Sequence, residues 1–482
     1  MTNDPSRLLL VASNRGPVSY ERAVDGSLTA RRGGGGMVSG LTSGLAAAAA
    51  DGGVLWLCTA LSDADREAAR LGARAAAHGE PAVRMLDIPP AVFDAAYNGI
   101  ANSVLWFVHH LLFDTPNQPR FGVEFRRDWA AYRAYNEAFA AALAEESVAD
   151  TRVLIQDYHL ALAPRMLRDR RPDARIAHFQ HTPWAPPEYY RLLPDEVAAA
   201  ILDGMLGADH AGFLAQRWAS AFLDCCEVVL GARVMRGAGG GGRVSHRGRV
   251  TDVAVHPLGV DSAALRARAA EADVRAAAAT LTRLAEGRQL IVRVDRTELS
   301  KNIVRGLDAY RELLAARPEW RGNVTHLAFA YPSRSALTEY RAYTERVHEL
   351  AGQINAEFGR PDWQPLILEV KDDYPRSLAA SKLADVLLVN PIRDGMNLVA
   401  EEGPILSERG CALVLSREAG AAALIGDDAL IVNPYDVTAT ADALHTGLAM
   451  PAFERRRRSA AIAAAAEAHA PQHWLAEQLD VL

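Results

Sequence analysis

Short apolar runs alternate with longer helical stretches along the whole chain. Such runs are typical of strands that are covered on both faces, and their alternation with helices predicts an α/β fold with parallel sheets. The rhythm pauses at residues 256–261 and restarts near residue 290, so two halves of similar size are expected. The predicted strands are 8–13, 54–57, 153–156, 176–179, 211–214 and 250–255 in the first half, and 290–294, 325–329, 366–368, 386–389, 412–415 and 430–432 in the second.

The domain limits follow from this pause. A chain of 482 residues is too long for one hydrophobic core and suits two or three domains. We predict a Rossmann-like domain over 1–258, a second over 259–463, and a C-terminal helix over 464–482 whose packing on the first domain the sequence leaves open. The glycine tract 237–242 lacks a following Lys-Ser/Thr pair, so it is interpreted as a hairpin tip rather than a phosphate-binding loop.

Composition argues against several classes of protein. The net charge of −7 disfavours a broad nucleic-acid-binding surface, and no apolar run is long enough to cross a membrane. The first residues lack the basic and apolar segments of a signal peptide. The four cysteines have no metal-binding spacing, so a reduced cytoplasmic protein without metal or cofactor is expected. A homo-oligomer is compatible with the sequence, which does not fix the number of subunits.

Residues 386–402 combine a strand, a glycine turn and a helix start. The strand ends at a proline, a polar Arg-Asp-Gly turn follows, and a helix is predicted from Met396 to about Ser407. Free backbone N–H groups and the positive end of the helix then meet at one spot, which suits a phosphate. The carboxylates of Asp394 and Glu402 are suited to sugar hydroxyls. The segment therefore predicts a nucleotide-sugar site.

Two cations follow the predicted strand 290–294. Arg296 and Lys301 are separated by a short turn at the carboxyl end of that strand, where ligands of open α/β sheets bind. Cations on both sides of a diphosphate would clamp it. The alternative is a loop that is only salt-bridged, with Asp295 and Glu298 as partners. The neighbouring nucleotide-sugar segment favours the clamp.

The loop after strand 366–368 carries adjacent carboxylates at Asp372 and Asp373. Guanine presents two N–H donors that suit one carboxylate, whereas uracil presents a single N–H. A carboxylate at the base end of the pocket would favour guanine. A solvated loop or a helix N-cap is the alternative interpretation.

Polar side chains end two neighbouring strands of the first half. Asp157 and His159 follow one strand, and His181 follows the next. Because parallel strands deliver their carboxyl ends to one edge, this group favours sugar binding over buried core histidines or a zinc site.

Other residues of the first half give weaker signals. Arg15 follows the first strand, where it is placed to meet an anion. Glycines at 33–36 open the next helix and allow close approach of a pyrophosphate, with a flexible loop as the alternative. From the sequence alone, Tyr97 and Trp106 are interpreted as core or lid residues.

These motifs together resemble the trehalose-6-phosphate synthase family, glycosyltransferase family 20, whose members are retaining enzymes of the GT-B architecture. The resemblance runs from Ser13 to Trp474, and its most specific part is Arg-Asp-Gly-Met-Asn-Leu-Val-Ala at 393–400. The other matching motifs are Ser-Asn-Arg at 13–15, Gly-Gly at 35–36, Val-Leu-Trp at 104–106, Asp-Tyr-His at 157–159, His-Thr-Pro at 181–183, Asp-Arg at 295–296, Ser-Lys at 300–301, Pro-Ser-Arg at 332–334 and Asn-Pro-Tyr-Asp at 433–436.

The resemblance implies a role for each matching residue and two Rossmann-like domains that face each other across a cleft. The first domain would bind the acceptor, glucose 6-phosphate, and the second the nucleotide diphosphate glucose. The implied acceptor residues are Arg15, Tyr97, Trp106, Asp157 and Arg334. The implied donor residues are Gly35, Gly36, Arg296, Lys301, Asp372, Asp394, Leu398, Val399 and Glu402. His181 would lie at the reaction centre, and Asp157, Arg296, Lys301 and Asp394 would act there with it.

Two departures from the family pattern bear on the donor. Glu298 stands where the family usually has aspartate, and Asp372 stands where phenylalanine is common. Members commonly use UDP-glucose and some use GDP-glucose. The Asp372 argument favours GDP-glucose here, with UDP-glucose as the alternative.

The predicted reaction is transfer of glucose, with retention, to glucose 6-phosphate, giving trehalose 6-phosphate. Residues 182–222 also resemble the validoxylamine 7′-phosphate synthases, which join pseudo-sugars through nitrogen. The intact motifs at 157–159 and 393–397 favour the sugar enzyme. A non-catalytic sugar-phosphate sensor is the third interpretation, and its expected loss of the cation clamp or of Asp394 is not seen.

Overall fold

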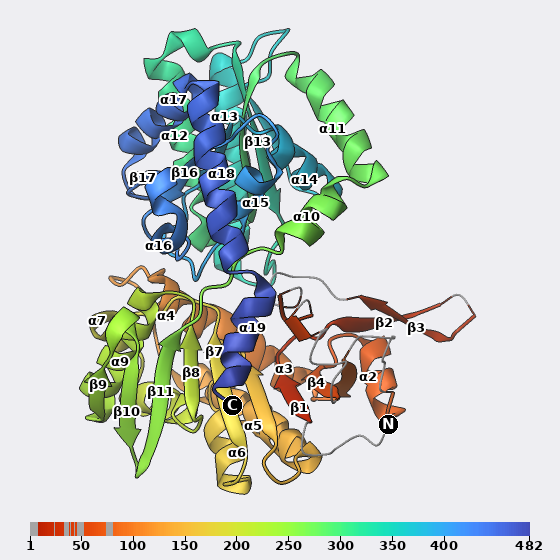
Figure 1. The fold of residues 1–482 in the computed structure, drawn as a ribbon, viewed down its shortest axis with the longest axis vertical. Helices are drawn as coiled ribbons and strands as arrows, with labels where there is room; N and C mark the ends of the chain where they lie inside the picture. The colour runs from red at the N-terminus through yellow and green to blue at the C-terminus, as the bar shows by residue number, and fades with distance from the viewer. Residues whose placement is uncertain are drawn as a thin grey trace. The chain divides into compact units, whose positions relative to one another are not determined.

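The computed structural model describes residues 8–23, 25–32, 38, 40–42, 44–45, 53–73 and 81–482. The chain divides into two compact units (Figure 1). Unit 1 comprises Met1–Leu258 together with Pro471–Leu482, and unit 2 comprises Gly259–Ala470. Each unit is built on its own sheet, so each is described by itself.

Unit 1 contains a nine-stranded sheet in the order β5-β4-β1-β6-β7-β8-β11-β10-β9. The strands from β5 to β11 in this order are parallel, and β9, β10 and β11 pair antiparallel at one edge. Buried apolar side chains fill the central strands, as expected for a sheet covered on both faces. The strands are β1 (Leu9–Ala12), β4 (Val54–Thr59), β5 (Ala82–Leu86), β6 (Arg152–Gln156), β7 (Arg175–Gln180), β8 (His210–Phe213), β9 (Arg233–Arg236), β10 (Gly242–His246) and β11 (Arg249–Val255).

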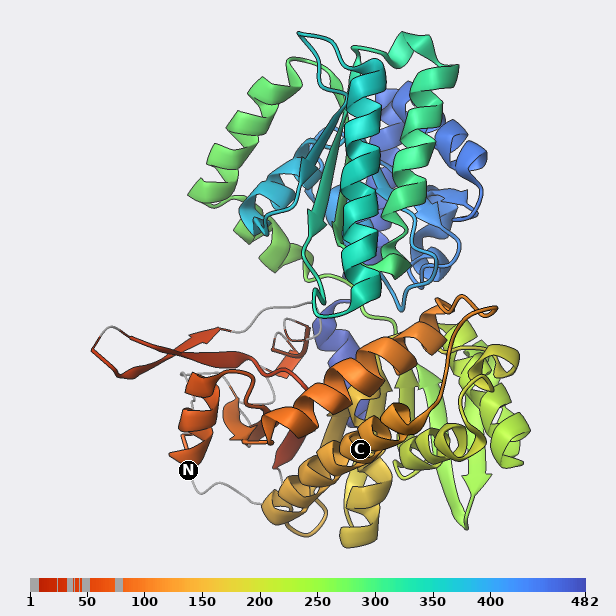
Figure 2. The same cartoon turned by 180° about the vertical axis from the view of Figure 1, so that it is seen from behind.

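Helices cover both faces of this sheet. The last helix, α19, lies in front of it in Figure 1, and the long helix α5 lies in front of it in the reverse view of Figure 2. A π-helix, η2, precedes α4 and packs along α5. The helices are α2 (Asp63–Arg70), α3 (Pro90–Asp94), η2 (Ala95–Leu105), α4 (Trp106–His110), α5 (Val123–Glu146), η3 (Tyr158–Leu160), α6 (Ala163–Arg170), α7 (Pro187–Tyr190), α8 (Asp195–Met205), α9 (Gln216–Leu230), η4 (Ala238–Gly240) and α19 (Pro471–Asp480).

Unit 2 contains a six-stranded parallel sheet in the order β14-β13-β12-β15-β16-β17. The strands are β12 (Gln289–Arg296), β13 (Val324–Tyr331), β14 (Leu366–Glu369), β15 (Val386–Val389), β16 (Ala412–Ser416) and β17 (Leu430–Val432). The helices are α10 (Ser262–Ala269), α11 (Ala272–Ala285), η5 (Leu299–Lys301), α12 (Ile303–Ala316), η6 (Pro318–Trp320), α13 (Thr338–Phe358), α14 (Tyr374–Leu383), α15 (Val399–Leu406), α16 (Ala422–Ile425), η7 (Gly426–Asp428), α17 (Val437–Ala449) and α18 (Ala452–Ala468).

The predicted strands are confirmed, each within a few residues of its predicted ends. The glycine tract forms the turn between the antiparallel strands β9 and β10, as predicted. The predicted single helix over 464–482 is wrong. Helix α18 ends at Ala468, and Pro471 begins α19, because proline is tolerated at the first position of a helix but not in its interior. A further hairpin, β2 (Val18–Arg22) with β3 (Leu28–Arg32), was not predicted.

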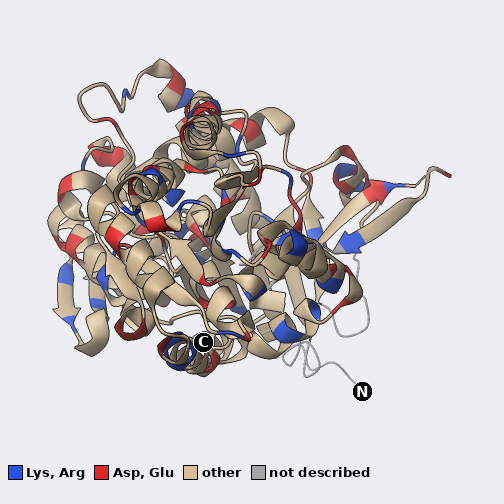
Figure 3. Ribbon diagram, turned by 90° about the horizontal axis from the view of Figure 1, so that it is seen from above, with Lys and Arg blue, Asp and Glu red and all other residues tan. Residues whose placement is uncertain are grey.

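Charged residues are interspersed over the chain. Figure 3 shows Lys and Arg interspersed with Asp and Glu along the ribbon. Within the described ranges, no helix is both long and apolar enough to cross a membrane.

Candidate functional site

The predicted cation Lys301 and the predicted sugar-binding residue Asp394 lie together in unit 2. Strand β12 ends at Arg296, and the 3₁₀ turn η5 brings Lys301 back over the carboxyl edge of the sheet. The ammonium Nζ lies 2.6 Å from Oδ2 of Asp394, and Asn397 donates to the same oxygen at 3.1 Å. Burial acts to lower the pKa of Lys301, but Asp394 and Asp295 outweigh it and raise this pKa. The lysine is therefore charged at neutral pH.

The helix after the Arg-Asp-Gly turn begins later than predicted. Helix α15 starts at Val399 rather than Met396. The residues before it are held by the neighbouring loop, since the amide of Asp394 donates to the Glu418 carbonyl and the Met396 carbonyl accepts from Ala421. Asn397 also has a φ of 76°, outside the helical region. Leu398 is the N-cap residue of α15, so the first amides of the helix have no intrahelical acceptor and, among the described residues, no capping side chain.

Arg296 and Arg334 flank a fully buried carboxylate, Glu298. Nη1 of Arg296 lies 3.1 Å from Oε1 of Glu298, and Ser333 donates to that oxygen at 2.8 Å. Nη1 of Arg334 lies 4.0 Å from Oε2 of Glu298 and 2.6 Å from the hydroxyl of Tyr340. Burial acts to raise the pKa of Glu298, but Arg296 and Arg334 outweigh it and lower the pKa to about 2. The predicted salt bridge of this loop exists, and it leaves the Arg296 side chain 54% exposed and able to contact a ligand.

A buried ion pair next to the Lys301 turn was missed by the sequence prediction. Arg293 is 0% exposed and lies 2.7 Å from Asp295, and it also donates to the backbone carbonyl of Lys301 at 3.0 Å. An arginine inside an apolar strand needs a buried partner, so the run Leu-Ile-Val-Arg-Val carried a signal that could have found it.

Adjacent glutamates occupy helix α15. Glu401 is fully buried and accepts the amide of Val260 at 3.0 Å, and burial raises its pKa to about 8. Burial also raises the pKa of Glu402, the predicted ribose ligand, to about 7. A protonated carboxyl is able to donate as well as accept a hydrogen bond, which suits a hydroxyl ligand.

The carboxylates of the 371–373 loop differ in environment. Asp373 is the N-cap of α14 and accepts the amide of Arg376 at 3.0 Å, so for this residue the alternative interpretation is confirmed. Asp372 is exposed and remains able to contact a ligand.

The predicted polar group of unit 1 lies together at the ends of β6 and β7. The carboxylate of Asp157 lies 3.6 Å from Nδ1 of His159 and accepts the amide of His181 at 3.2 Å. Nε2 of His181 lies 2.7 Å from the amide oxygen of Gln156, a contact that the sequence prediction missed. Burial acts to raise the pKa of Asp157, but His159 and His181 outweigh it and lower this pKa. Asp157 therefore stays ionised at neutral pH.

An aromatic stack extends this polar group. The Tyr97 ring, in the π-helix η2, lies parallel to the His159 ring with centroids 5.5 Å apart. Trp106 begins α4 and stacks on His110 with centroids 3.8 Å apart. Tyr97 thus belongs to the site cluster, and Arg15 lies exposed after β1. The predicted donor residues Gly35 and Gly36 lie outside the described residues.

The last helix, α19, packs against the His181 side of this cluster. Trp474 in α19 packs edge-on against Phe179 at 5.0 Å and contacts the His181 ring at 5.7 Å between centroids. On the same helix, Glu477 lies 2.9 Å from Nδ1 of His256. Nε2 of His256 in turn lies 2.9 Å from Nε2 of His210.

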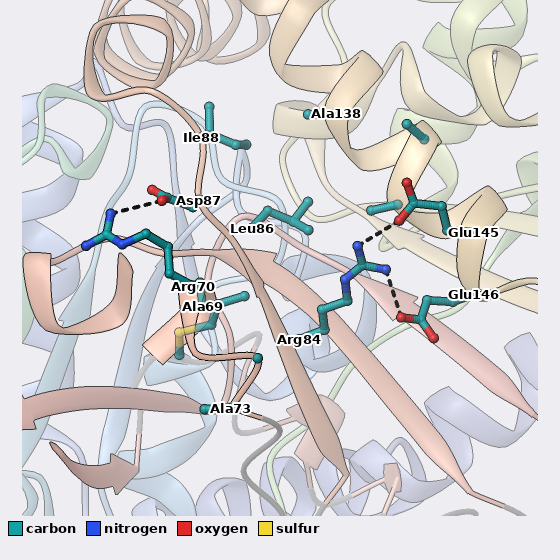
Figure 4. A pocket seen from close by; sticks show the side chains of 14 residues that line it. Ala69, Arg70, Ala73, Arg84, Leu86, Asp87, Ile88, Ala138, Glu145 and Glu146 are labelled. Carbon is teal, nitrogen blue, oxygen red and sulfur yellow. Dashed lines mark hydrogen bonds and ion pairs between the residues drawn. The ribbon is translucent and has the colours of Figure 1, made fainter. Parts of the chain in front are cut away.

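A cavity of about 610 Å³ in unit 1 lies apart from these side chains, beside β5 and α5 (Figure 4). Its charged lining groups pair with one another: Arg84 lies 2.8 Å from Glu145, and Arg70 lies 3.1 Å from Asp87. None of the predicted site residues line it. In the part of the chain that the structure describes, no cluster of His, Cys, Asp and Glu could hold a metal ion.

Comparisons with known proteins agree on one family. The sequence profile of glycosyltransferase family 20 matches residues 7–482. The alpha,alpha-trehalose-phosphate synthase [UDP-forming] of Schizosaccharomyces pombe is 32% identical over 475 residues, which cover 97% of this chain and 89% of the relative. The validamine 7-phosphate valienyltransferase of Streptomyces hygroscopicus subsp. jinggangensis is 32% identical over 89% of this chain and 85% of the relative. The structure of the trehalose-6-phosphate protein of E. coli with UDP-2-fluoro glucose superimposes with a TM-score of 0.84 at 27% identity, covering 98% of both chains.

Proposed function

The chain belongs to glycosyltransferase family 20, and we propose that this retaining glycosyltransferase of the GT-B architecture makes trehalose 6-phosphate from a nucleoside diphosphate glucose and glucose 6-phosphate. The observation that carries the proposal is the Lys301–Asp394 pair at the carboxyl edge of the unit 2 sheet. The cation proposed for the phosphate and the carboxylate proposed for the sugar lie 2.6 Å apart, and Asp394 precedes helix α15 by a few residues. The name of the S. pombe relative supports the product.

Unit 2 would bind the donor. Arg296 and Lys301 would hold the diphosphate from two sides, and the amides of Leu398 and Val399 would donate to its oxygens. Asp394 would then accept hydroxyls of the glucose, and Glu402 those of the ribose. These roles follow the family resemblance, and the charge and position of each group in unit 2 support them.

Unit 1 would bind the acceptor. Asp157 is ionised and would accept a hydroxyl of glucose 6-phosphate, with Trp106 lining the acceptor pocket. Arg15, Tyr97 and Arg334 keep the role that the family resemblance implies, which is to hold the acceptor phosphate. The glycines at 35 and 36 keep their proposed role next to the donor.

The proposed chemistry is front-face displacement. The bond between the glucose C1 and the diphosphate oxygen breaks as the acceptor hydroxyl oxygen bonds to C1 on the same face. The acceptor proton passes to the leaving diphosphate oxygen, whose growing charge Arg296 and Lys301 stabilise. His181 would lie at this centre as a neutral hydrogen-bonding group, since burial lowers its pKa. Holding both substrates in position supplies much of the rate.

For the donor base we propose uracil, with guanine as the alternative that is tested. The relative from S. pombe is named UDP-forming, and the E. coli structure contains a UDP sugar. The exposed carboxylate of Asp372 still favours guanine, because it is able to accept both N–H groups of that base. If Asp372 contacts the base, Asp372→Asn weakens GDP binding more than UDP binding, as measured by calorimetry. An unchanged ratio of the two affinities would remove the guanine argument.

The test of the function is a donor panel. UDP-glucose and GDP-glucose are each mixed with glucose 6-phosphate, and release of the nucleoside diphosphate is followed. NMR of the product should show an α,α-linked disaccharide phosphate formed only with both substrates present. Binding of the nucleotides and of glucose 6-phosphate without any transfer would instead identify a sensor.

A second candidate rests on the Streptomyces relative, which is named a validamine 7-phosphate valienyltransferase. It is 32% identical to this chain, the same identity as the S. pombe relative. Turnover of validamine 7-phosphate as acceptor, with none of glucose 6-phosphate, would favour this candidate.

A further inference from the structure

A buried arginine lies directly below the Lys301–Asp394 pair and has no part in the reaction above. Arg293 sits near the middle of strand β12 with 0% of its side chain exposed. Its Nη2 lies 2.7 Å from Oδ2 of Asp295, and its Nε lies 3.2 Å from the same oxygen. Burying such a pair costs free energy, and apolar residues of similar volume often replace one without loss of stability. Stability alone therefore gives a weak reason for this arginine.

The guanidinium also holds the turn that carries Lys301. Nη2 donates to the backbone carbonyl of Lys301 at 3.0 Å, and Nη1 lies 3.5 Å from the carbonyl of Ile303. One planar, rigid group thus ties strand β12 to η5 and to the first turn of α12. Arginine suits this role because its donors are fixed in one plane, whereas a lysine ammonium would reach fewer acceptors.

The backbone of α12 is shaped to admit this side chain. A Cβ added to Gly306 would collide with Nη1 of Arg293 and would lie 3.1 Å from Oδ1 of Asn390. A glycine in a helix interior costs about 1 kcal/mol relative to alanine. Here it leaves the space that the guanidinium fills.

We propose that Arg293 is a positioning residue that fixes the backbone of Lys301, so that the lysine ammonium meets the diphosphate of the donor. This inference rests on the proposed function and deepens it. Arg293 touches no substrate and acts through the carbonyl of Lys301 and the carboxylate of Asp295.

The inference includes an electrostatic consequence. Burial raises the pKa of Asp295, while Arg293 and Lys301 act to lower it. Without Arg293 the pKa of Asp295 should rise further, because burial is then less opposed. The pH profile of kcat/KM should therefore change in Arg293→Met, which a loss of packing alone would not cause.

The experiment compares Arg293→Met with Arg168→Met. Arg168 is a matched control in unit 1: it is also buried, lies 2.6 Å from Asp209, and donates to the carbonyl of Gly207 at 3.2 Å. UDP and GDP binding is measured by calorimetry, transfer by initial rates, and folding by thermal unfolding. We expect Arg293→Met to lower kcat about 100-fold, because a displacement of about 1 Å has that cost. Arg168→Met should lose about as much thermal stability as Arg293→Met. Its nucleotide affinity and kcat should equal those of the wild type.

Gly306→Ala gives a second test that keeps the native arginine. The new methyl group should displace the guanidinium and reduce kcat and nucleotide affinity in the wild-type background. In the Arg293→Met background the same change should have little further effect. Such non-additivity would indicate that the two residues act through one shared contact. If Arg293→Met does not fold, Arg293→Lys takes its place in both experiments.

The outcomes are distinguishable. Wild-type kcat, nucleotide affinity and pH profile in Arg293→Met would overturn the positioning role and leave the proposed function intact. A wild-type protein that binds neither UDP nor GDP would overturn the proposed function itself. Additive effects of Gly306→Ala and Arg293→Met would show that the two residues do not act through one contact and would count against the inference.

Discussion

The ammonium of Lys301 lies 2.6 Å from Oδ2 of Asp394, and both side chains are largely buried, at 15% and 17% exposure. The cation proposed for the diphosphate and the carboxylate proposed for the sugar therefore neutralise each other without a ligand. A donor would bring its own negative charge to Lys301, and Asp394 would become free to accept sugar hydroxyls. The pairing therefore satisfies two largely buried charges in the absence of a ligand.

Replacement of Lys301 by alanine should remove most transfer activity. The loss of one cation facing the leaving diphosphate should reduce kcat/KM by about 100-fold or more. Lys382→Ala is the matched control, because Lys382 pairs at 2.8 Å with the exposed Glu408 and has no predicted role. Steady-state kinetics of the two variants checks the prediction, and a Lys301→Ala enzyme as active as the control would contradict the clamp.

Replacement of Arg334 by alanine should raise KM for glucose 6-phosphate about tenfold, as expected for the loss of one charged hydrogen bond. KM for the donor should change far less. The side chain has only 8% exposure and contacts Glu298 and Tyr340. Kinetics with each substrate varied in turn measures the split. Arg341→Ala, at an exposed arginine of the next helix, is the control. Equal increases in both KM values would argue that Arg334 acts only through Glu298.

Glu401→Gln should flatten the dependence of stability on pH. Burial raises the pKa of Glu401 from 4.5 to about 8, so its contribution to stability is complete below pH 4.5 and is lost as pH rises toward 8. Between these values the wild type should lose roughly 2–4 kcal/mol relative to the variant. Urea unfolding at pH 5 and pH 8 measures the difference. Parallel curves for the two proteins would show that Glu401 ionises without cost.

The buried pair of His210 and His256 should make the folded protein less stable in acid. Burial, followed by the neighbouring His256, lowers the pKa of His210 from 6.5 to about 4. The group therefore contributes stability above pH 6.5, and this contribution is lost as pH falls toward 4, by about 2 kcal/mol at pH 5. His210→Gln keeps a donor facing His256 and cannot titrate, so it should lose less stability between pH 7 and pH 5. His246→Gln, at a half-buried histidine beside Asp203, is the control, and an acid loss in His210→Gln equal to that of the wild type would refute the assignment.

The strands were predictable because buried parallel strands are continuous apolar runs. Strands 386–389 and 430–432 have the predicted bounds. The β2–β3 hairpin was missed because its strands are polar and pair only with each other. The π-helix η2 was missed for a related reason, since its backbone hydrogen bonds leave no mark in residue periodicity.

In the site, linear motifs were visible and long-range contacts were not. The sequence located Arg296, Lys301 and Asp394, and the pairing of the last two appears only once β12 and β15 lie side by side. The start of α15 was misplaced because the hydrogen bonds of the 394–396 turn to the 418–421 loop are tertiary. The contact of Trp474 with His181 joins the last helix to the middle of the chain, which no local pattern encodes.

The return of helix α19 to unit 1 has a consequence for biosynthesis. A ribosome finishes Gly259–Ala470 before it makes Pro471–Asp480, so the first sheet must wait for the whole second unit before Trp474 covers Phe179 and His181. Early in translation that edge is exposed to solvent and to chaperones. The proposed acceptor site therefore matures last, and a nascent chain stalled before residue 471 would carry a complete second unit and an incomplete first one.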